Sequence, residues 1–178
     1  SKKHSNGTER IFEGYKKLKS KYDLIIDIQG DEPLINPKHI DDVVKFHKKN
    51  FNYDIILPHL SLDHADNTNI VKIITNLKNE VIYLSRSKLP LEFKKRVKSY
   101  KKHLSIISFL PKALEKFNKY KKTPLEISED IELLRAIEIS LKIKTLELKG
   151  DSFSIDILDD YKKAINIFKK DKIFKSYK

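Results

Sequence analysis

The residues that most clearly could bind a metal ion or take part in a reaction are two adjacent carboxylates in the segment 24–35. This segment reads Leu-Ile-Ile-Asp-Ile-Gln-Gly-Asp-Glu-Pro-Leu-Ile, so an apolar run is interrupted by Gly30 and followed by Asp31, Glu32 and Pro33. An α/β sheet ends its buried strands in this way and binds ligands outside their carboxyl ends. Because Mg²⁺ is held by one or two carboxylates together with substrate phosphates, Asp31 is a candidate magnesium ligand.

Each chemical reading of these residues has a structural alternative. Asp31 could cap the turn after Gly30, since aspartate is common in turns. Asp156 could be a turn or helix cap before Asp159. Gln29 could simply end its strand.

Two basic residues leave the same choice open. Arg86 follows a predicted strand and is one of only four arginines, but exposed arginines often form ordinary surface ion pairs. His103 begins a predicted strand, and histidines are commonly half-buried in cores.

The composition bounds the class of protein. A chain of 178 residues fits one domain, and 39% hydrophobic residues can form a core beside a surface that is rich in charge. The sequence has no apolar stretch of 18 residues, so no membrane partner is expected. Without cysteine, disulfides and thiolate metal sites are excluded, and a cytoplasmic location is expected.

The net charge of +12 raises the question of nucleic-acid binding. The excess is carried almost entirely by scattered lysines, whereas base recognition favours arginine. We interpret the charge as a solvated surface and expect no nucleic-acid partner, although a basic nucleic-acid binder remains the non-enzymatic alternative.

The elements that must position these residues alternate along the chain. Apolar periodicity, prolines and capping residues predict helices over 8–21 (capped by Asn6 or Thr8), from Asn36-Pro37, from Pro111, from Thr123-Pro124 and over 159–169. Short apolar runs predict strands over 22–29, 53–62, 70–75, 81–85, 103–109, 143–148 and 154–157. In the helix after Pro124, the predicted buried stripe consists of Ile127, Ile131, Leu134, Ile137 and Leu141.

This alternation predicts an α/β fold with helices on the faces of a sheet. The strands over 70–75 and 81–85 read as a hairpin, which makes the sheet mixed rather than purely parallel. Residues 88–102 are basic and lack periodicity, so we expect them to form a long exposed loop.

Five segments resemble, in order and spacing, the motifs of one enzyme family. They are His-Ser-Asn-Gly-Thr-Glu-Arg at 4–10, Gln-Gly-Asp-Glu-Pro at 29–33, Tyr-Leu-Ser-Arg-Ser-Lys-Leu-Pro at 83–90, Thr-Pro-Leu-Glu with Glu-Leu-Leu-Arg at 123–126 and 132–135, and Ser-Ile-Asp with Asp-Asp at 154–156 and 159–160. Together they resemble the 3-deoxy-manno-octulosonate (Kdo) cytidylyltransferases, over nearly the whole chain.

The resemblance implies a fold and a reaction. The fold is a nucleotide-diphospho-sugar-transferase-like, Rossmann-like mixed sheet, here a single domain over 1–178 with a dimerisation and sugar-binding excursion at 86–110. The reaction transfers CMP from CTP to Kdo and releases pyrophosphate, for lipopolysaccharide biosynthesis, with Mg²⁺ as cofactor and a homodimer as the expected assembly.

The resemblance also assigns site residues. The catalytic metal ligands are Asp31 and Asp156. The nucleotide-binding residues are Asn6, Gly7, Thr8 and Asp31. The sugar-binding residues are Gln29, Arg86, His103 and Glu126, of which Glu126 has the alternative role of pinning its helix.

The chain departs from the family pattern in three places. Asn6 replaces a serine. Residues 105–110 read Ser-Ile-Ile-Ser-Phe-Leu where the family commonly has Gly-Ile-Tyr-Gly-Tyr-Arg. This second difference keeps another acidic sugar, such as 8-amino-Kdo or a nonulosonic acid, as an alternative substrate. Nothing matches the Arg- and Lys-bearing loop that holds the triphosphate. We therefore expect a C-terminal portion of the enzyme, with a sheet incomplete at its N-terminus and weak or no activity by itself.

Overall fold

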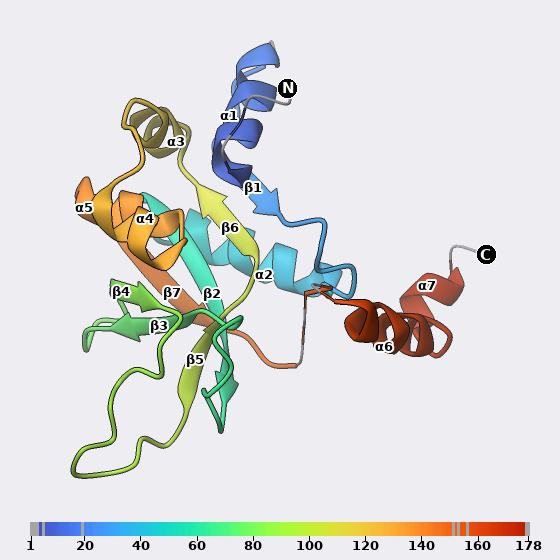
Figure 1. Cartoon of the computed structure of the whole chain (residues 1–178). Coiled ribbons are helices and arrows are strands. Elements are labelled where there is room, and N and C mark those ends of the chain that lie inside the picture. Colours follow the sequence, from blue (N-terminus) through green and yellow to red (C-terminus); the bar gives the residue numbers. More distant parts are fainter. Residues whose placement is uncertain are drawn as a thin grey trace.

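A mixed β-sheet forms the centre of the molecule (Figure 1). The computed structural model describes residues 4, 6–18, 20–150, 152, 154–155 and 157–176. Within these residues the sheet has seven strands. They are β1 (Ile25–Ile28), β2 (Ile55–Leu62), β3 (Lys72–Thr75), β4 (Val81–Ser85), β5 (Tyr100–His103), β6 (Ile106–Phe109) and β7 (Ile143–Glu147).

Strand β2 organises this sheet. The strand order is β1-β6-β2-β5-β3-β4, and β7 lies along the other edge of β2. β2 pairs antiparallel with β6 through Ile55 and Phe109, antiparallel with β5 through His59 and His103, and parallel with β7. The predicted mixed sheet and its β3–β4 hairpin are therefore confirmed.

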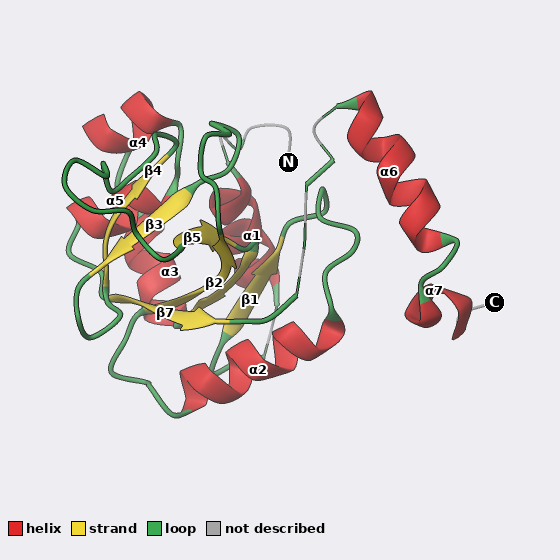
Figure 2. Ribbon diagram, turned by 90° about the horizontal axis from the view of Figure 1, so that it is seen from below, coloured by secondary structure: helices red, strands yellow, loops and turns green. Residues whose placement is uncertain are grey.

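Helices cover both faces of the sheet (Figures 1 and 2), because successive side chains of β2 point to opposite faces and residues 55–60 are all buried. Ile55 and Leu57 belong to one core cluster with side chains from the face of α1, α3, α4 and α5, whereas Ile56 and Leu60 pack on the opposite face with Val43 of α2. The helices are α1 (Gly7–Lys17), α2 (Pro37–Lys48), α3 (Pro111–Asn118), α4 (Pro124–Glu129), α5 (Leu133–Glu138), α6 (Leu158–Phe168) and α7 (Lys172–Ser176).

The predicted helix starts are confirmed by their caps. The side chain of Asn6 accepts a hydrogen bond from the backbone amide of Glu9 at 2.9 Å, so Asn6, rather than Thr8, caps α1. Asn36 caps α2 in the same way, with Pro37 in the first turn. These caps satisfy amides that have no partner within their own helix.

The predicted strand over 103–109 is wrong in one respect, because it is two strands. β5 ends at His103 and β6 begins at Ile106, with a tight turn in which the amide of Ile106 donates to the carbonyl of Leu104 at 2.7 Å. β5 pairs with the C-terminal half of β2 and β6 with its N-terminal half. The predicted exposed loop over 88–102 is correspondingly shorter, since Tyr100 is buried in β5.

The single long helix predicted after Pro124 is also wrong. α4 ends at Asp130, whose φ of 52° is left-handed, and α5 begins at Leu133. This break resets the helical phase, so Ile127 is 65% exposed while Ile131 and Leu134 are buried.

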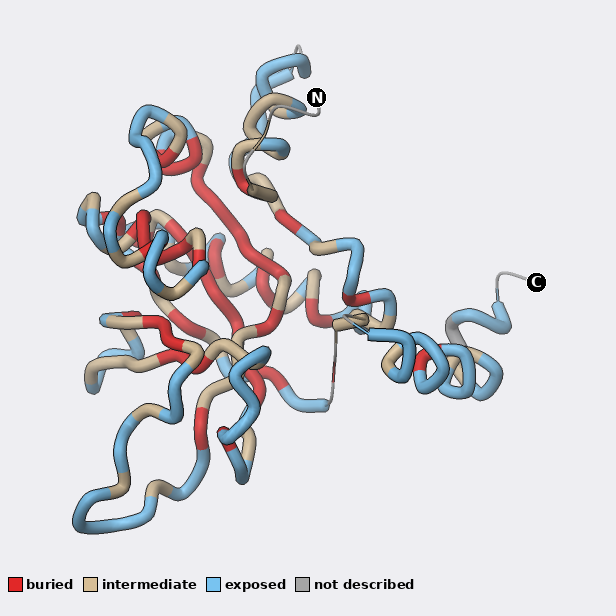
Figure 3. The backbone as a smooth tube through the Cα atoms, in the orientation of Figure 1, coloured by how far each residue is buried: buried red, intermediate tan, exposed pale blue. Residues whose placement is uncertain are grey.

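The C-terminal segment differs from the sheet in exposure (Figure 3). Residues 154, 155 and 157 are not in a strand, contrary to the prediction, and the closing helix α6 is confirmed and followed by α7, which was not predicted. α6 and α7 project from the body of the molecule (Figure 1). No helix in the described parts of the chain is long and apolar enough to cross a membrane.

Candidate functional site

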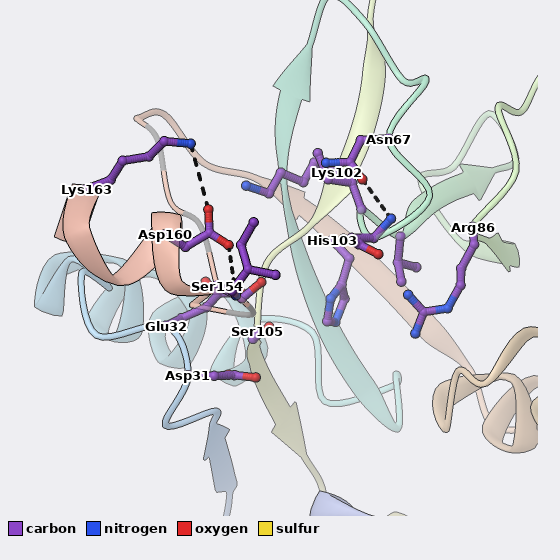
Figure 4. Close-up of a pocket in the computed structure, with 14 residues that line it drawn as sticks. Asp31, Glu32, Asn67, Arg86, Lys102, His103, Ser105, Ser154, Asp160 and Lys163 are labelled. Carbon is purple, nitrogen blue, oxygen red and sulfur yellow. Dashed lines mark hydrogen bonds and ion pairs between the residues drawn. The ribbon is translucent and has the colours of Figure 1, made fainter.

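A cavity of about 680 Å³ lies between the end of β1, the ends of the β3–β4–β5 strands and the chain that leads into α6. Figure 4 shows Asp31 and Glu32 on one side of it and His103 and Arg86 on the other. The cavity thus collects side chains from both halves of the sequence at one edge of the sheet.

Asp31 lies beside the segment that carries the second predicted carboxylate. The backbone amide of Ile155 donates a hydrogen bond to the carbonyl oxygen of Asp31 at 2.8 Å, although the two are far apart in sequence. Ser154 lines the same cavity as Asp31. Asp156 itself lies outside the described residues.

The carboxylate of Asp31 is exposed and makes no hydrogen bond or ion pair with any described residue. Its neighbour Glu32 is buried and accepts a hydrogen bond from the hydroxyl of Ser152 at 2.7 Å. The two adjacent carboxylates therefore differ in role, since Glu32 fastens the chain near residue 152 and Asp31 is open to a ligand.

Arg86 is held by backbone oxygens rather than by a carboxylate. Its Nε donates to the carbonyl of Glu129 at 2.9 Å, and its Nη2 donates to the carbonyl of Asp130 at 3.1 Å. The Glu129 carboxylate instead accepts from the backbone amide of Arg86. Its Nη1 donates to the carbonyl of Thr68 at 3.4 Å, so backbone oxygens orient the guanidinium beside the cavity that Arg86 lines, and among the described residues it has no ion pair.

His103 borders the main cavity and has an orphaned nitrogen. Its Nε2 is buried and has no hydrogen-bond partner among the described residues. Burial lowers the pKa of His103 to about 4, with the nearby carboxylate of Glu32 opposing the shift only in part. His103 is therefore neutral at pH 7, and its Nε2 can donate a hydrogen bond to a ligand or accept one, depending on the tautomer.

A second cavity of about 180 Å³ adjoins the first across His103 and is also lined by Gln29, Ile107 and Glu132. The amide of Gln29 donates to both oxygens of Asp27, each at 3.0 Å, which fixes its orientation. Ile107 and Ser105, in the segment where the chain departs from the family pattern, line the second and the first cavity respectively.

The start of α1 packs against this second cavity. A Cβ atom on Gly7 would lie 2.8 Å from Nε2 of Gln29, so only glycine lets the two groups approach this closely. The backbone amide of Thr8 donates to Glu132 at 3.2 Å. The structure thus brings Gly7 next to Gln29 and Thr8 next to Glu132, whereas Asn6 contacts Glu126 and Asp31 lines the main cavity.

Two buried carboxyls lie under this contact. Burial raises the pKa of Asp27 to about 7, and the charge of Glu132 adds to the shift. Burial also raises the pKa of Glu132, against the hydrogen bond from the backbone amide of Thr8. Carboxyls with raised pKa values are typical of functional sites but also occur in structural networks.

The structure places Glu126 away from both cavities. Its carboxylate accepts two hydrogen bonds from the buried guanidinium of Arg135, at 2.7 and 2.6 Å, and a third from the backbone amide of Thr123 at the start of α4, at 3.3 Å. Asn6 reaches the same carboxylate through its side-chain amide at 3.4 Å. Glu126 therefore pins its helix and connects it to the start of α1.

Several cavity residues were missed from the sequence. They are Glu32, Asn67, Asn69, Lys102, Ser105, Ser154, Asp160 and Lys163. Glu32, Ser154 and Asp160 belong to motifs that were recognised, so their neighbours could have identified them. Asn67, Asn69 and Lys163 carry no signal in a single sequence, because loop packing brings them to the cavity.

The donor set fits Mg²⁺. Within the described residues no three His, Cys, Asp or Glu side chains are grouped to hold a metal ion. Mg²⁺ needs no such group, since one or two carboxylates with phosphate oxygens and water complete its octahedron. The exposed, unpaired carboxylate of Asp31 meets that requirement, and Asp156 is adjacent in sequence to Ile155, which bonds to Asp31.

The chain is a nucleotidyltransferase with a mixed α/β fold, and it belongs to the cytidylyltransferase family. The sequence model of that family, described as cytidylyltransferase, matches residues 1–143. The chain is 36% identical over 176 residues to the 3-deoxy-manno-octulosonate cytidylyltransferase of Fusobacterium nucleatum, covering 97% of this chain and 71% of the relative.

Two further relatives carry the same enzyme name. The mitochondrial 3-deoxy-manno-octulosonate cytidylyltransferase of Arabidopsis thaliana is 34% identical over 169 residues, or 92% of this chain and 58% of the relative, so the chain spans little more than half of that protein. The enzyme of the same name from Leptospira interrogans serogroup Icterohaemorrhagiae serovar Lai is 37% identical over 97% of this chain and 70% of its own length.

A solved structure confirms the fold. The structure of CMP:2-keto-3-deoxy-manno-octonic acid synthetase complexed with CTP superposes with a TM-score of 0.87 over 94% of this chain and 70% of that chain, at 23% identity. The mixed α/β architecture is therefore shared with that protein.

Proposed function

We propose that this cytidylyltransferase activates Kdo with CTP and produces CMP-Kdo and pyrophosphate, for lipopolysaccharide biosynthesis. The observation that carries the proposal is one cavity that holds an open carboxylate, Asp31, on one wall and an oriented cation, Arg86, on the other. Relatives named for this reaction support it across nearly the whole chain.

The proposed chemistry is a single displacement. The anomeric 2-hydroxyl of the sugar attacks the α-phosphorus of CTP, the new oxygen–phosphorus bond replaces the bond to the β-phosphate, and pyrophosphate leaves with the proton passing to solvent. The protein contributes position and charge rather than a covalent intermediate. Asp31 and Asp156 would hold Mg²⁺, which neutralises phosphate charge when bound.

The sugar acid is the substrate that the cationic wall suits. Arg86 would pair with its carboxylate, since guanidinium binds carboxylates through two parallel hydrogen bonds. His103 would exchange a hydrogen bond with a sugar hydroxyl through its orphaned Nε2. Gln29 would present its amide from the second cavity.

A second candidate substrate is another acidic sugar, such as 8-amino-Kdo or a nonulosonic acid. This alternative is supported by Ile107, which lines the second cavity at a position where the family pattern has tyrosine. An isoleucine removes a phenol that could bond to a hydroxyl or amino group.

The test is pyrophosphate release by the complete gene product with CTP, Mg²⁺ and each acidic sugar in turn. We expect kcat/KM for Kdo to exceed that for the other acidic sugars. A higher kcat/KM for 8-amino-Kdo or a nonulosonic acid would show that this sugar, and not Kdo, is the substrate. If no acidic sugar causes pyrophosphate release, the proposed function is wrong.

The expected homodimer is also part of this proposal. The loop between β4 and β5 exposes Leu91 by 76% and Phe93 by 85%, which is unusual for large apolar side chains. Sedimentation equilibrium of the wild type and of a Phe93→Ser variant would test whether this loop lies in a dimer contact.

A further inference from the structure

Lys72 is a fully buried lysine at the start of β3, in an otherwise apolar run from Ile70 to Ile74. Its ammonium donates to the carbonyl of Asn67 at 3.0 Å, to the carbonyl of Ile70 at 2.7 Å, and to the carbonyl of Arg86. A buried lysine is rare unless its charge is satisfied.

The three acceptors share one property, since Asn67, Ile70 and Arg86 all line the main cavity. Two belong to the loop before β3 and one follows β4. Directly before β3, the carbonyl of Val71 accepts from the amide of His103 at 2.9 Å. Lys72 thus lies directly behind the cavity wall, where the segments that carry Arg86 and His103 meet.

These contacts need the charged form of the side chain. Three carbonyl acceptors require three protons, which only the ammonium has. Burial lowers the pKa of Lys72, and the carboxylate of Glu129 opposes that shift. An apolar side chain at this position would remove the Nζ donor from all three part-buried carbonyls, of which that of Asn67 keeps another donor, the amide of Ile70 at 3.3 Å.

We propose that Lys72 is a positioning residue for the acidic substrate, because its ammonium fixes the backbone of Arg86 and of the loop 67–70 as one wall of the cavity. The inference rests on the proposed function for the identity of the ligand. It assigns to Lys72 no contact with the ligand itself.

The first test measures ligand binding by calorimetry with Lys72→Met and Lys72→Gln, and with Lys78→Met as the matched control, since Lys78 is an exposed lysine in the turn of the same hairpin. We expect Kd for Kdo to rise about tenfold or more in both Lys72 variants, which corresponds to the loss of one hydrogen bond to a charged group. Kd for CTP should stay within about twofold, and Lys78→Met should match the wild type.

The second test is hydrogen exchange without ligand, which reports on the wall itself. We expect faster exchange in Lys72→Met over residues 67–71 and 86–87, with unchanged exchange over the turn at 76–80. If Lys72→Met does not fold, Lys72→Gln, which keeps an amide donor, decides the same comparison.

The outcomes separate the inference from the proposed function. Loss of affinity for Kdo but not for CTP, together with faster exchange of the wall, supports the positioning role. Equal loss for both ligands, or unchanged exchange, overturns it. If the wild type binds no acidic sugar, the proposed function fails, while the exchange comparison still decides whether Lys72 holds the wall.

Discussion

The amide of Ile155 donates a 2.8 Å hydrogen bond to the carbonyl of Asp31, and this contact joins the chain before α6 to the turn after β1. It brings residue 155 to the turn that carries the open carboxylate of Asp31. We propose that Asp156, the next residue in the sequence, shares one Mg²⁺ ion with Asp31.

The contact of Gly7 with Gln29 predicts that a methyl group costs more in function than in stability. In Gly7→Ala the new Cβ would lie 2.8 Å from Nε2 of Gln29, so the amide would shift from its two hydrogen bonds with Asp27. We expect a small fall in Tm and a fall of about tenfold in kcat/KM for Kdo, the effect of about 1.4 kcal/mol of lost transition-state stabilisation.

Gly14→Ala is the control for that substitution, because no atom lies within 4 Å of its added Cβ. It should stabilise α1 by about 0.5–1 kcal/mol and leave activity unchanged. Equal kinetics for the two alanine variants would show that Gln29 does not need its present position.

The raised pKa of Asp27 predicts how stability depends on pH. Between its ordinary pKa of 3.8 and about 7, Asp27 is ionised in the unfolded chain and protonated in the folded one. The folded state then binds more protons, so this group lowers the free energy of unfolding as pH rises through that window.

Asp27→Asn removes this titration. We expect the variant to gain stability relative to the wild type by more than about 1 kcal/mol between pH 4 and pH 7, since one pKa unit corresponds to about 1.4 kcal/mol. Urea unfolding at several pH values measures the difference, and a gap that does not change with pH would contradict the buried protonated carboxyl.

Arg86 is expected to act through its charge. Arg86→Gln keeps a hydrogen-bond donor but removes the cation that faces the cavity, so Kd for Kdo should rise about tenfold or more while Kd for CTP is unchanged. Arg96→Gln, at an exposed position in the loop before β5, is the matched control. If both variants bind Kdo as the wild type does, Arg86 is not the carboxylate partner.

Much of the fold follows from local signals in the sequence. The caps at Asn6 and Asn36, the hairpin of β3 and β4, and the strand β7 depend on neighbouring residues or on short apolar runs, and each was predicted, whereas the parallel pairing of β7 with β2 was not. The errors arose at two breaks in predicted elements: at Leu104, where β5 and β6 pair with different halves of β2, and at Asp130, whose left-handed backbone follows the end of α4.

The site was less accessible to sequence reasoning than the fold. Asp31, Arg86 and His103 do line one cavity, and Gln29 lines its neighbour, but they were assigned through motifs rather than geometry. Lys72 was missed because its role depends on carbonyls from two loops. A lone lysine within an apolar run was the only available signal for it.

The most direct test of the central claim is pyrophosphate release by Asp31→Asn in the complete gene product, with CTP, Kdo and Mg²⁺. Asparagine keeps the shape but loses the charge that Mg²⁺ requires, so we predict a loss of at least about a hundredfold in kcat, or about 2.7 kcal/mol, with unchanged Tm. The control is Asp41→Asn, an exposed aspartate of α2, which should match the wild type. Near-normal turnover by Asp31→Asn would contradict the assignment of Asp31 as the metal ligand.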